Sequence, residues 1–242
     1  MANRYNEIFK SFPQLYLETS PVLMMAGALL EDTVNEKNLV LLKLKNLAED
    51  NIISCKVSVQ AFDEEGKTEE GITEYCYEGL DICEGQEFGA KEPIYLSGRD
   101  AKTFCAAVTE VTFKNGQIWQ HSVCEWKQVP MQEAVVERIS EPEILEQYEL
   151  EAGKNSAFVP IMRNGLFQCT CGTTNLASAK ICHRCKRSVA TVNAAFDIDA
   201  LKQKREERLQ REAIARAKAE AARVEAMWPA TAPPPPPCWL RP

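Results

Sequence analysis

Four cysteines, Cys169, Cys171, Cys182 and Cys185, lie within seventeen residues of this 242-residue chain. They form a C-x-C pair and a C-x-x-C pair with ten residues between them. Two such pairs can supply the ligands of a tetrahedral zinc site, with Zn–S distances of about 2.3 Å. Because four thiolates leave no position for water or substrate, the spacing predicts one structural zinc ion per chain rather than a catalytic one. Two disulfides or four unrelated thiols are the alternative, and His183 is a less favoured ligand inside the second pair.

The rest of the sequence lacks the common motifs of enzyme chemistry. It has no Gly-rich phosphate loop, no G-x-S-x-G elbow and no histidine–carboxylate metal motif. His121 lies three residues from Cys124, so on a strand the two would face opposite sides and could not act as base and nucleophile. We therefore expect no enzymatic activity, and an enzyme of unrecognised type is the least favoured alternative.

Length and composition are those of a folded protein without a membrane segment. Hydrophobic residues make up 45% of the chain, and the longest apolar run, residues 22–30, has about half the length of a membrane-spanning helix. The N-terminus has no unbroken apolar stretch of the kind found in signal peptides. Ten cysteines without an export signal indicate a reducing compartment. We expect a cytoplasmic protein.

Charge is unevenly distributed along the chain, whose net charge is −7. Residues 1–150 hold 13 Lys and Arg against 27 Asp and Glu, a net of −14. Residues 151–190 hold 6 against 1, and residues 191–242 hold 9 against 7. The acidic part would repel a phosphate backbone, so any nucleic-acid binding is expected after residue 150.

Strand-like runs recur through residues 1–126. Asn115-Gly116 is a strong hairpin signal, because these residues tolerate the positive φ of a type I′ turn. Cys55, Val57 and Val59 alternate with polar residues. About seven short strands without a helical repeat predict two packed antiparallel sheets of immunoglobulin-like architecture. The runs are residues 22–30, 38–45, 54–63, 72–77, 93–96, 104–113 and 117–123.

Residues 45–47 and 57–66 resemble bacterial sandwich modules of the FxLYD-like kind. Those modules share a strand, a short loop and a long strand that ends in an aromatic-aspartate-glycine turn. The resemblance covers a short part of the chain and implies a β-sandwich fold with no activity of its own. Such modules generally present surfaces to partners.

Five cysteines lie in this first part: Cys55, Cys76, Cys83, Cys105 and Cys124. A Cys55–Cys105 disulfide between the sheets is one alternative. The odd count and the missing export signal favour reduced thiols that behave as small hydrophobic side chains. Alternation places Cys55 beside Val57, and Cys105 on the same side as Val111, so both are expected to be buried.

Residues 127–164 are expected to form a helical linker that spaces the sheets from the cysteine-rich segment. Residues 132–139 predict one short helix. A second is expected after Ser140, a candidate N-cap. The apolar face of this second helix is expected at Ile144, Leu145 and Tyr148. Its C-terminal end is expected at Gly153 and Asn155.

The cysteine-rich segment, residues 165–190, is similar to zinc fingers of the Ran-binding-protein type. That family has an aromatic residue two before the first ligand and an asparagine four after the second, where this chain has Phe167 and Asn175. In the family the asparagine ties the two cysteine-bearing turns, or knuckles, together, and the resemblance implies this role for Asn175. Phenylalanine replaces the usual tryptophan and the first pair is shorter than in the family, so a generic zinc ribbon is the alternative.

The family's known binding modes imply no specific partner here. Its RNA-binding members use arginines soon after the asparagine, where this chain has one lysine. Its ubiquitin-binding members use a Thr-Phe pair, where this chain has Thr173-Thr174. A basic cluster is the candidate nucleic-acid contact, although cations also surround a zinc–thiolate centre whose own charge is −2. The cluster consists of Lys180, Arg184, Lys186 and Arg187.

Residues 196–228 predict one long charged helix, because residues 200–227 contain strong helix formers and no Gly or Pro. Asp197 or Asp199 is its candidate N-cap. Apolar and small residues at 3–4 spacing from Ile214 onward favour a coiled coil or a partner helix, so self-association is one expectation. A solvated single-helix stalk is the alternative.

Residues 229–242 form a Pro-rich tail, which we expect to be disordered or in the polyproline II conformation. The tail ends abruptly, and the sequence favours a truncated or frameshifted C-terminus.

These features predict a non-enzymatic adaptor that combines an acidic immunoglobulin-like sandwich, a structural zinc finger and a charged helix, and that binds another protein. A nucleic-acid-associated protein that acts through the basic half is the alternative. The motifs do not name the partner, because a binding module recognises it through surface shape.

Overall fold

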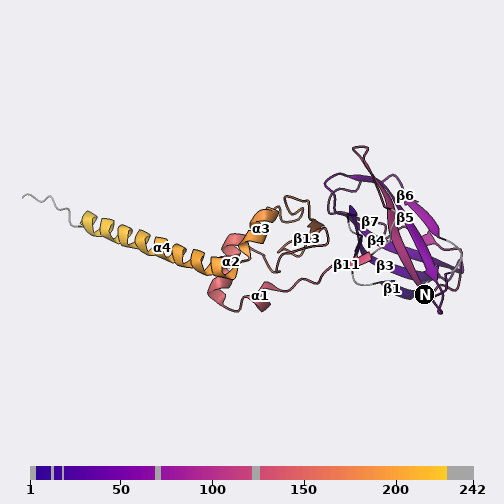
Figure 1. The fold of residues 1–242 in the computed structure, drawn as a ribbon, viewed down its shortest axis with the longest axis horizontal. Helices are drawn as coiled ribbons and strands as arrows, with labels where there is room; N and C mark the ends of the chain where they lie inside the picture. The colour runs from indigo at the N-terminus through magenta and orange to yellow at the C-terminus, as the bar shows by residue number, and fades with distance from the viewer. Residues whose placement is uncertain (1–3, 12–13, 18, 69–71, 122–125, 228–242) are drawn as a thin grey trace, which may run out of the picture.

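The structure, a computed structural model, consists of two large antiparallel β-sheets, a small three-stranded sheet and four helices in its described part (Figure 1). It describes residues 4–11, 14–17, 19–68, 72–121 and 126–227. Cys124 and the predicted tail at residues 229–242 lie outside these ranges. The described part is mainly β, with a long helix at its C-terminal end, as predicted.

The first large sheet has seven strands in the order β11-β2-β3-β4-β7, with β1 also paired to β3 and β8 to β4. Four strands of this sheet, β1, β2, β7 and β11, lie outside the predicted runs. The last three have at most three residues, and β1 (YNEIFKS) is mostly polar. The strands are β1 (Tyr5–Ser11), β2 (Leu15–Leu17), β3 (Val22–Asp32), β4 (Lys37–Asn46), β7 (Glu87–Phe88), β8 (Ile94–Tyr95) and β11 (Trp126–Gln128).

The second large sheet has four strands in the order β10-β9-β5-β6. They are β5 (Ile52–Phe62), β6 (Thr73–Tyr77), β9 (Thr103–Phe113) and β10 (Ile118–Gln120). The two large sheets bury one hydrophobic core between them. As predicted for β5, alternate side chains face this core, because successive residues of a strand point to opposite faces. The central residues, each at most 1% exposed, are Val40, Leu42 and Leu44 of β4 and Cys55, Val57 and Val59 of β5.

A β-bulge in β9 overturns the predicted burial of Cys105. The register with β5 shifts between Lys56 and Val57, so Thr109 has no partner across the ladder. An extra residue reverses which side chains face inward: Val108 faces the core before the bulge and Val111 after it. Cys105 is therefore exposed, whereas Cys55 is buried as expected.

The predicted alternative of a Cys55–Cys105 disulfide is also wrong. Cys55 pairs across the sheet with Val111, whereas Cys105 pairs with Gln60. Neither of the two forms a disulfide.

The hairpin at Asn115-Gly116 forms, but its turn is not of the predicted type. The backbone N–H of Phe113 donates to the carbonyl of Gln117 (2.9 Å), so three residues form the loop. Only Gly116 has a positive φ, of 85°. A three-residue hairpin loop needs one left-handed residue, whereas a type I′ turn needs two.

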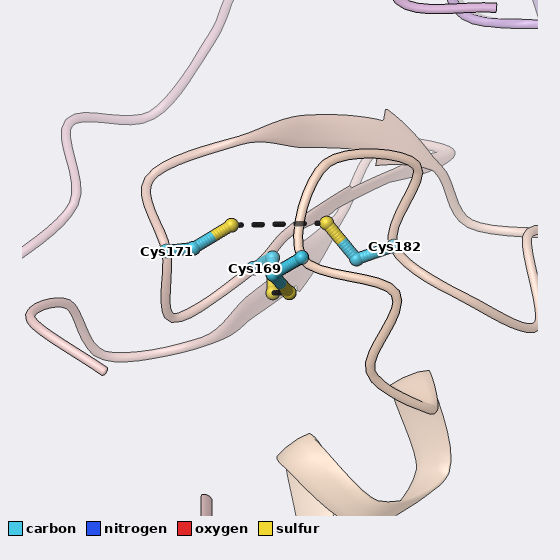
Figure 2. A group of neighbouring side chains, drawn as sticks. Cys169, Cys171 and Cys182 are labelled. Atoms are coloured by element: carbon cyan, nitrogen blue, oxygen red, sulfur yellow. Dashed lines mark hydrogen bonds between the residues drawn. The ribbon is translucent and has the colours of Figure 1, made fainter. Parts of the chain in front are cut away.

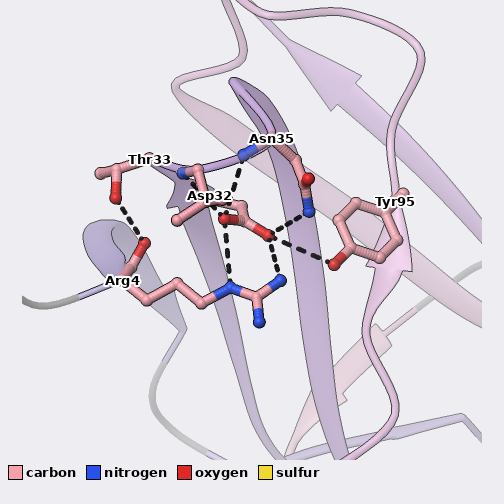
Figure 3. Close-up of polar contacts among 6 residues, drawn as sticks. Arg4, Asp32, Thr33, Asn35 and Tyr95 are labelled. Carbon is pink, nitrogen blue, oxygen red and sulfur yellow. Dashed lines mark hydrogen bonds and ion pairs between the residues drawn. The ribbon is translucent and has the colours of Figure 1, made fainter.

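A buried carboxylate fixes one end of the central strand β3 in the first sheet. The Asp32 side chain, 0% exposed, accepts hydrogen bonds from Arg4 Nη2 (2.9 Å), from the backbone N–H of Val34 (3.1 Å) and from Asn35 Nδ2 (2.8 Å). Figure 3 shows these contacts, with Tyr95 Oη reaching the same carboxylate. The Arg4 guanidinium holds the pKa of Asp32 well below its usual range. This network ties the start of β1 to the turn between β3 and β4.

The helices differ in detail from the prediction. The helix expected at residues 132–139 is restricted to α1 (Val135–Arg138), because Ala134 forms a β-bridge with Phe158. The next helix, α2 (Pro142–Ala152), has Glu141 rather than Ser140 at its N-cap. Proline fixes φ for the first helical position, which sets this start. As predicted, α2 buries Ile144 and Tyr148, and Gly153 ends it.

The long helix α4 (Ile198–Met227) is anchored at one end only. The Asp197 carboxylate accepts from the backbone N–H groups of Asp199 (3.0 Å) and Ala200 (3.1 Å), which confirms the predicted cap. The first turns pack on α2 around buried Leu201. Residues 213–227 are exposed throughout, and Figure 1 shows this end of α4 projecting from the body. None of the helices in the described ranges has the length and apolarity to cross a membrane.

The segment after β11 does not act as the predicted spacer. Leu166 of the cysteine-rich segment joins one apolar cluster with Tyr16, Leu23 and Leu47. The cysteine-rich segment therefore touches the seven-stranded sheet directly. The spacer prediction failed because contacts between distant parts of a chain leave no local pattern in the sequence.

Candidate metal centre

A three-stranded sheet holds the first cysteine pair. Its strands β12 (Ile161–Arg163), β13 (Leu166–Gln168) and β14 (Thr174–Leu176) pair in this order. Asn164 (φ 52°) and Gly165 (φ 76°) form the two-residue turn between β12 and β13. Asn-Gly is the commonest sequence for such a turn, and this signal could have shown that the cysteine-rich unit begins before residue 165. We refer to residues 161–187 as the finger.

Tight turns present the cysteines to a common point. In the first knuckle the N–H of Gly172 donates to the carbonyl of Cys169 (2.8 Å), and Gly172 has φ 81°. In the second, the N–H of Lys186 donates to the carbonyl of Cys182 (2.9 Å). Each turn brings its two thiols to the same side of the backbone.

The structure brings all four predicted ligands together. Their sulfur atoms lie within 4.8 Å of one another. Two close contacts join the two knuckles: Cys169 Sγ lies 3.5 Å from Cys185 Sγ, and Cys171 Sγ lies 3.7 Å from Cys182 Sγ. Figure 2 shows the Cys171–Cys182 contact across the centre.

These distances fit a metal centre and exclude disulfides. A disulfide bond is about 2.05 Å long, and all four thiols are free. A tetrahedron with metal–sulfur distances of about 2.3 Å has sulfur–sulfur edges of about 3.8 Å. The cluster could therefore hold a metal ion with little rearrangement. His183 is not a member of it.

The electrostatics of the cluster favour a cation at its centre. The thiol of Cys169 donates toward Cys171 and, with Thr173, lowers the pKa of Cys171 to about 4. The same contact raises the pKa of Cys169, and burial raises that of Cys185. The cluster's own hydrogen bonds thus stabilise one thiolate, whereas four thiolates require a compensating positive charge.

Asn175 links the two knuckles. It is 1% exposed. Its Nδ2 donates to the carbonyl of Thr173 (3.1 Å) and lies 3.6 Å from Cys182 Sγ, while its Oδ1 accepts from the backbone N–H of His183 (3.0 Å). Phe167, 0% exposed, packs against Cys169 and Cys182 in the finger core.

The predicted basic cluster divides into two parts. The Arg187 guanidinium donates to Ser156 Oγ (2.7 Å), to Thr170 Oγ1 (3.3 Å) and to the carbonyl of Lys154. It therefore joins the segment after α2 to the finger. The other three side chains, Lys180, Arg184 and Lys186, are exposed. Their predicted contact with nucleic acid stays a prediction.

Two supporting elements of the centre were not predicted. Helix α3 (Val189–Ala195) packs Val189 and Val192 against the cysteines, and the Ser188 side chain caps it. A serine followed by apolar residues at 3–4 spacing could have indicated this helix. Gln132 Nε2 donates to the carbonyl of Cys169 (3.1 Å) from the segment after β11, and no feature of the sequence points to that contact.

Comparison with known proteins does not assign a family. No protein-family model matches the chain, and no curated protein matches it. A 1.85 Å X-ray structure of a hypothetical protein from Peptoclostridium difficile 630 is similar over 44% of this chain and 89% of its own, with 13% sequence identity and a TM-score of 0.33. A likeness at this level carries no argument about fold or function.

Proposed function

We propose that this protein is a non-enzymatic adaptor whose finger holds one structural zinc ion. The observation that carries the proposal is the cluster of four free thiols within 4.8 Å. Four sulfur ligands in a tetrahedron are typical of structural zinc. They fill the coordination shell, so no position is left for a substrate.

The surroundings of the centre support a structural role. Two of the four cysteines, Cys169 and Cys182, are 0% exposed, and Phe167 and Val192 cover them. Such a site holds two knuckles in place, and its four sulfur ligands leave no coordination position open for chemistry.

The adaptor role rests on the surfaces that this centre connects. One is the pair of large sheets, for which we propose the immunoglobulin-like architecture because two antiparallel sheets share one core. The other is α4, whose residues 213–227 are exposed while its first turns are fixed to α2. A helix held at one end can present its free part to another protein, so we propose a protein partner.

Metal analysis of the purified full-length protein tests the zinc site. We expect one zinc per chain by elemental mass spectrometry, and four sulfur neighbours by X-ray absorption. Cys171→Ser should abolish zinc binding, whereas Cys83→Ser, which changes an exposed cysteine outside the cluster, should not. Metal-free protein after purification without a chelator would disprove the site, as would equal zinc content in both variants.

Affinity capture tests the adaptor role. The full chain and a chain that ends at Glu212 serve as baits in the native host. We expect a protein partner that only the full chain retains, because the shorter chain keeps the α2 contacts and loses the exposed part of α4. Capture that is the same with both chains would place the binding surface elsewhere.

A further inference from the structure

The finger sheet has two faces with different contacts. Side chains alternate along its strands, and Leu166 pairs with Leu176 while Phe167 pairs with Asn175. Phe167 and Asn175 face the cysteines. Leu166, 2% exposed, and Leu176 face the seven-stranded sheet, where they pack with Leu23 and other apolar residues. The metal face and the docking face are therefore two sides of the same three short strands.

A second contact joins the finger to Gly85, in the turn before β7. A Cβ atom added to Gly85 would lie 2.5 Å from Cδ2 of His183, a distance that side chains do not tolerate. His183 directly follows the ligand Cys182, and its backbone N–H is held by Asn175. The position of the imidazole against Gly85 therefore depends on the shape of the second knuckle.

The finger itself supplies little apolar packing around the centre that could hold this shape without metal. The buried cluster there consists of Phe167 and the ligands Cys169 and Cys182, together with Val189 and Val192 of α3. In so small a unit, metal binding supplies much of the folding free energy. Loss of the metal would thus disturb both faces of the finger sheet together.

A lysine of the large sheet faces the centre. Lys45 of β4 lines a cleft of about 470 Å³ between the sheet and the finger, together with His183. Burial lowers the pKa of Lys45, whereas Glu87 and the thiolates of Cys182 and Cys171 act to raise it. A zinc ion with four thiolates carries a net charge of −2 and would attract this ammonium group.

We propose that zinc controls the docking of the finger on the seven-stranded sheet. With the site loaded, the Leu166–Leu176 face and His183 are held against the sheet. With the site empty, the finger and the sheet separate. Because α2 and Arg187 connect the finger to α4, the metal then sets the direction of α4 relative to the large sheets. The inference rests on the proposed zinc site, but the control of docking can be disproved while the zinc site stands.

Nuclear magnetic resonance of the full-length protein tests the inference, with zinc content measured in the same samples. We expect an Overhauser contact between the methyl groups of Leu166 and Leu23, and one rotational correlation time for the finger and the large sheets. A chelator should abolish the methyl contact and give the two parts different correlation times. Added zinc should restore both.

Matched variants separate docking from metal binding. Gly85→Ala should keep one zinc per chain and lose the methyl contact, because the new Cβ displaces His183. Gly66→Ala is the control: Gly66 has φ 75° against 79° for Gly85, and within the described ranges no atom beyond the adjoining residues lies within 4 Å of its added Cβ. Lys45→Gln removes a charge that faces the centre and should weaken docking. Lys43→Gln removes a charge that instead pairs with Glu87 (2.8 Å) and should have a smaller effect.

The outcomes distinguish the two proposals. Protein that binds zinc, but keeps the methyl contact and one correlation time after the zinc is removed, would overturn the control of docking and leave the zinc site intact. Protein that binds no zinc would overturn both. A methyl contact equally strong in Gly85→Ala and Gly66→Ala would show that His183 does not hold the interface.

Discussion

Replacement of Asn175 by alanine should weaken zinc binding without touching a ligand. The two shortest hydrogen bonds of this side chain join the knuckles, from Nδ2 to the carbonyl of Thr173 (3.1 Å) and from the N–H of His183 to Oδ1 (3.0 Å). Alanine leaves the N–H of His183 without this partner, at about 1–3 kcal/mol. It also removes one of two hydrogen bonds to the carbonyl of Thr173, which still accepts from the N–H of Cys169 (2.9 Å), at about 0.5–1.5 kcal/mol. Toward the lower end of both ranges, the loaded finger loses about 2 kcal/mol.

This loss should appear as a change in zinc affinity, because folding of the finger and zinc binding are one process. Since about 1.4 kcal/mol corresponds to a factor of ten, zinc should bind roughly 30-fold more weakly to Asn175→Ala. Competition with a fluorescent chelator on the full-length protein measures the ratio. Asn175→Asp should be weaker still, because a carboxylate would replace the amide group that lies 3.6 Å from Cys182 Sγ.

The control for this experiment is Asn193→Ala, which changes an exposed asparagine of α3. Its zinc affinity should equal that of the unmodified protein. An Asn175→Ala affinity within twofold of the control would refute the argument that this side chain holds the knuckles together.

Three further predictions concern the rest of the molecule. In the folded protein the exposed Cys105 should react quickly with a thiol reagent. Cys55 should react only after denaturation, because burial raises the pKa of its thiol and blocks access. Mass spectrometry of labelled peptides measures both reactions. The pKa of Asp32 is lower in the folded protein than the unfolded-state value of about 4, so the ionised carboxylate stabilises the fold above pH 4. The melting temperature should therefore fall as the pH drops below about 4. Asp32→Asn should make the melting temperature less dependent on pH and should lower it at neutral pH. Nucleic acid should bind only weakly and dissociate as salt is raised; binding that survives physiological salt and is lost in Arg184→Gln would favour the nucleic-acid alternative.

Local patterns in the sequence were sufficient for the ligands, for most of the long strands and for α4. The four cysteines are close in the chain, and short turns alone bring each pair together. The alternation of Cys55, Val57 and Val59 is seen in the structure because one face of β5 lines the core between the two large sheets. The cap at Asp197 involves residues two and three positions away, so it too is visible in the sequence.

Features that depend on distant contacts could not be predicted in this way. The face of Cys105 depends on a bulge opposite Lys56, about fifty positions earlier in the chain. Arg187, expected as a surface cation, is bound to Ser156 and Thr170. Nothing near either residue in the sequence signals these outcomes.

The sequence by itself therefore determined that four thiols could share a metal ion, that strands precede them and that a charged helix follows. These properties come from spacing and periodicity over a few residues. Only the tertiary structure decided what surrounds the centre: Lys45 of β4, Gly85 in the turn before β7, and Leu166 and Leu176 packed against Leu23. The physical reason is that packing of one unit on another depends on the three-dimensional match of two surfaces, each assembled from separate segments of the chain.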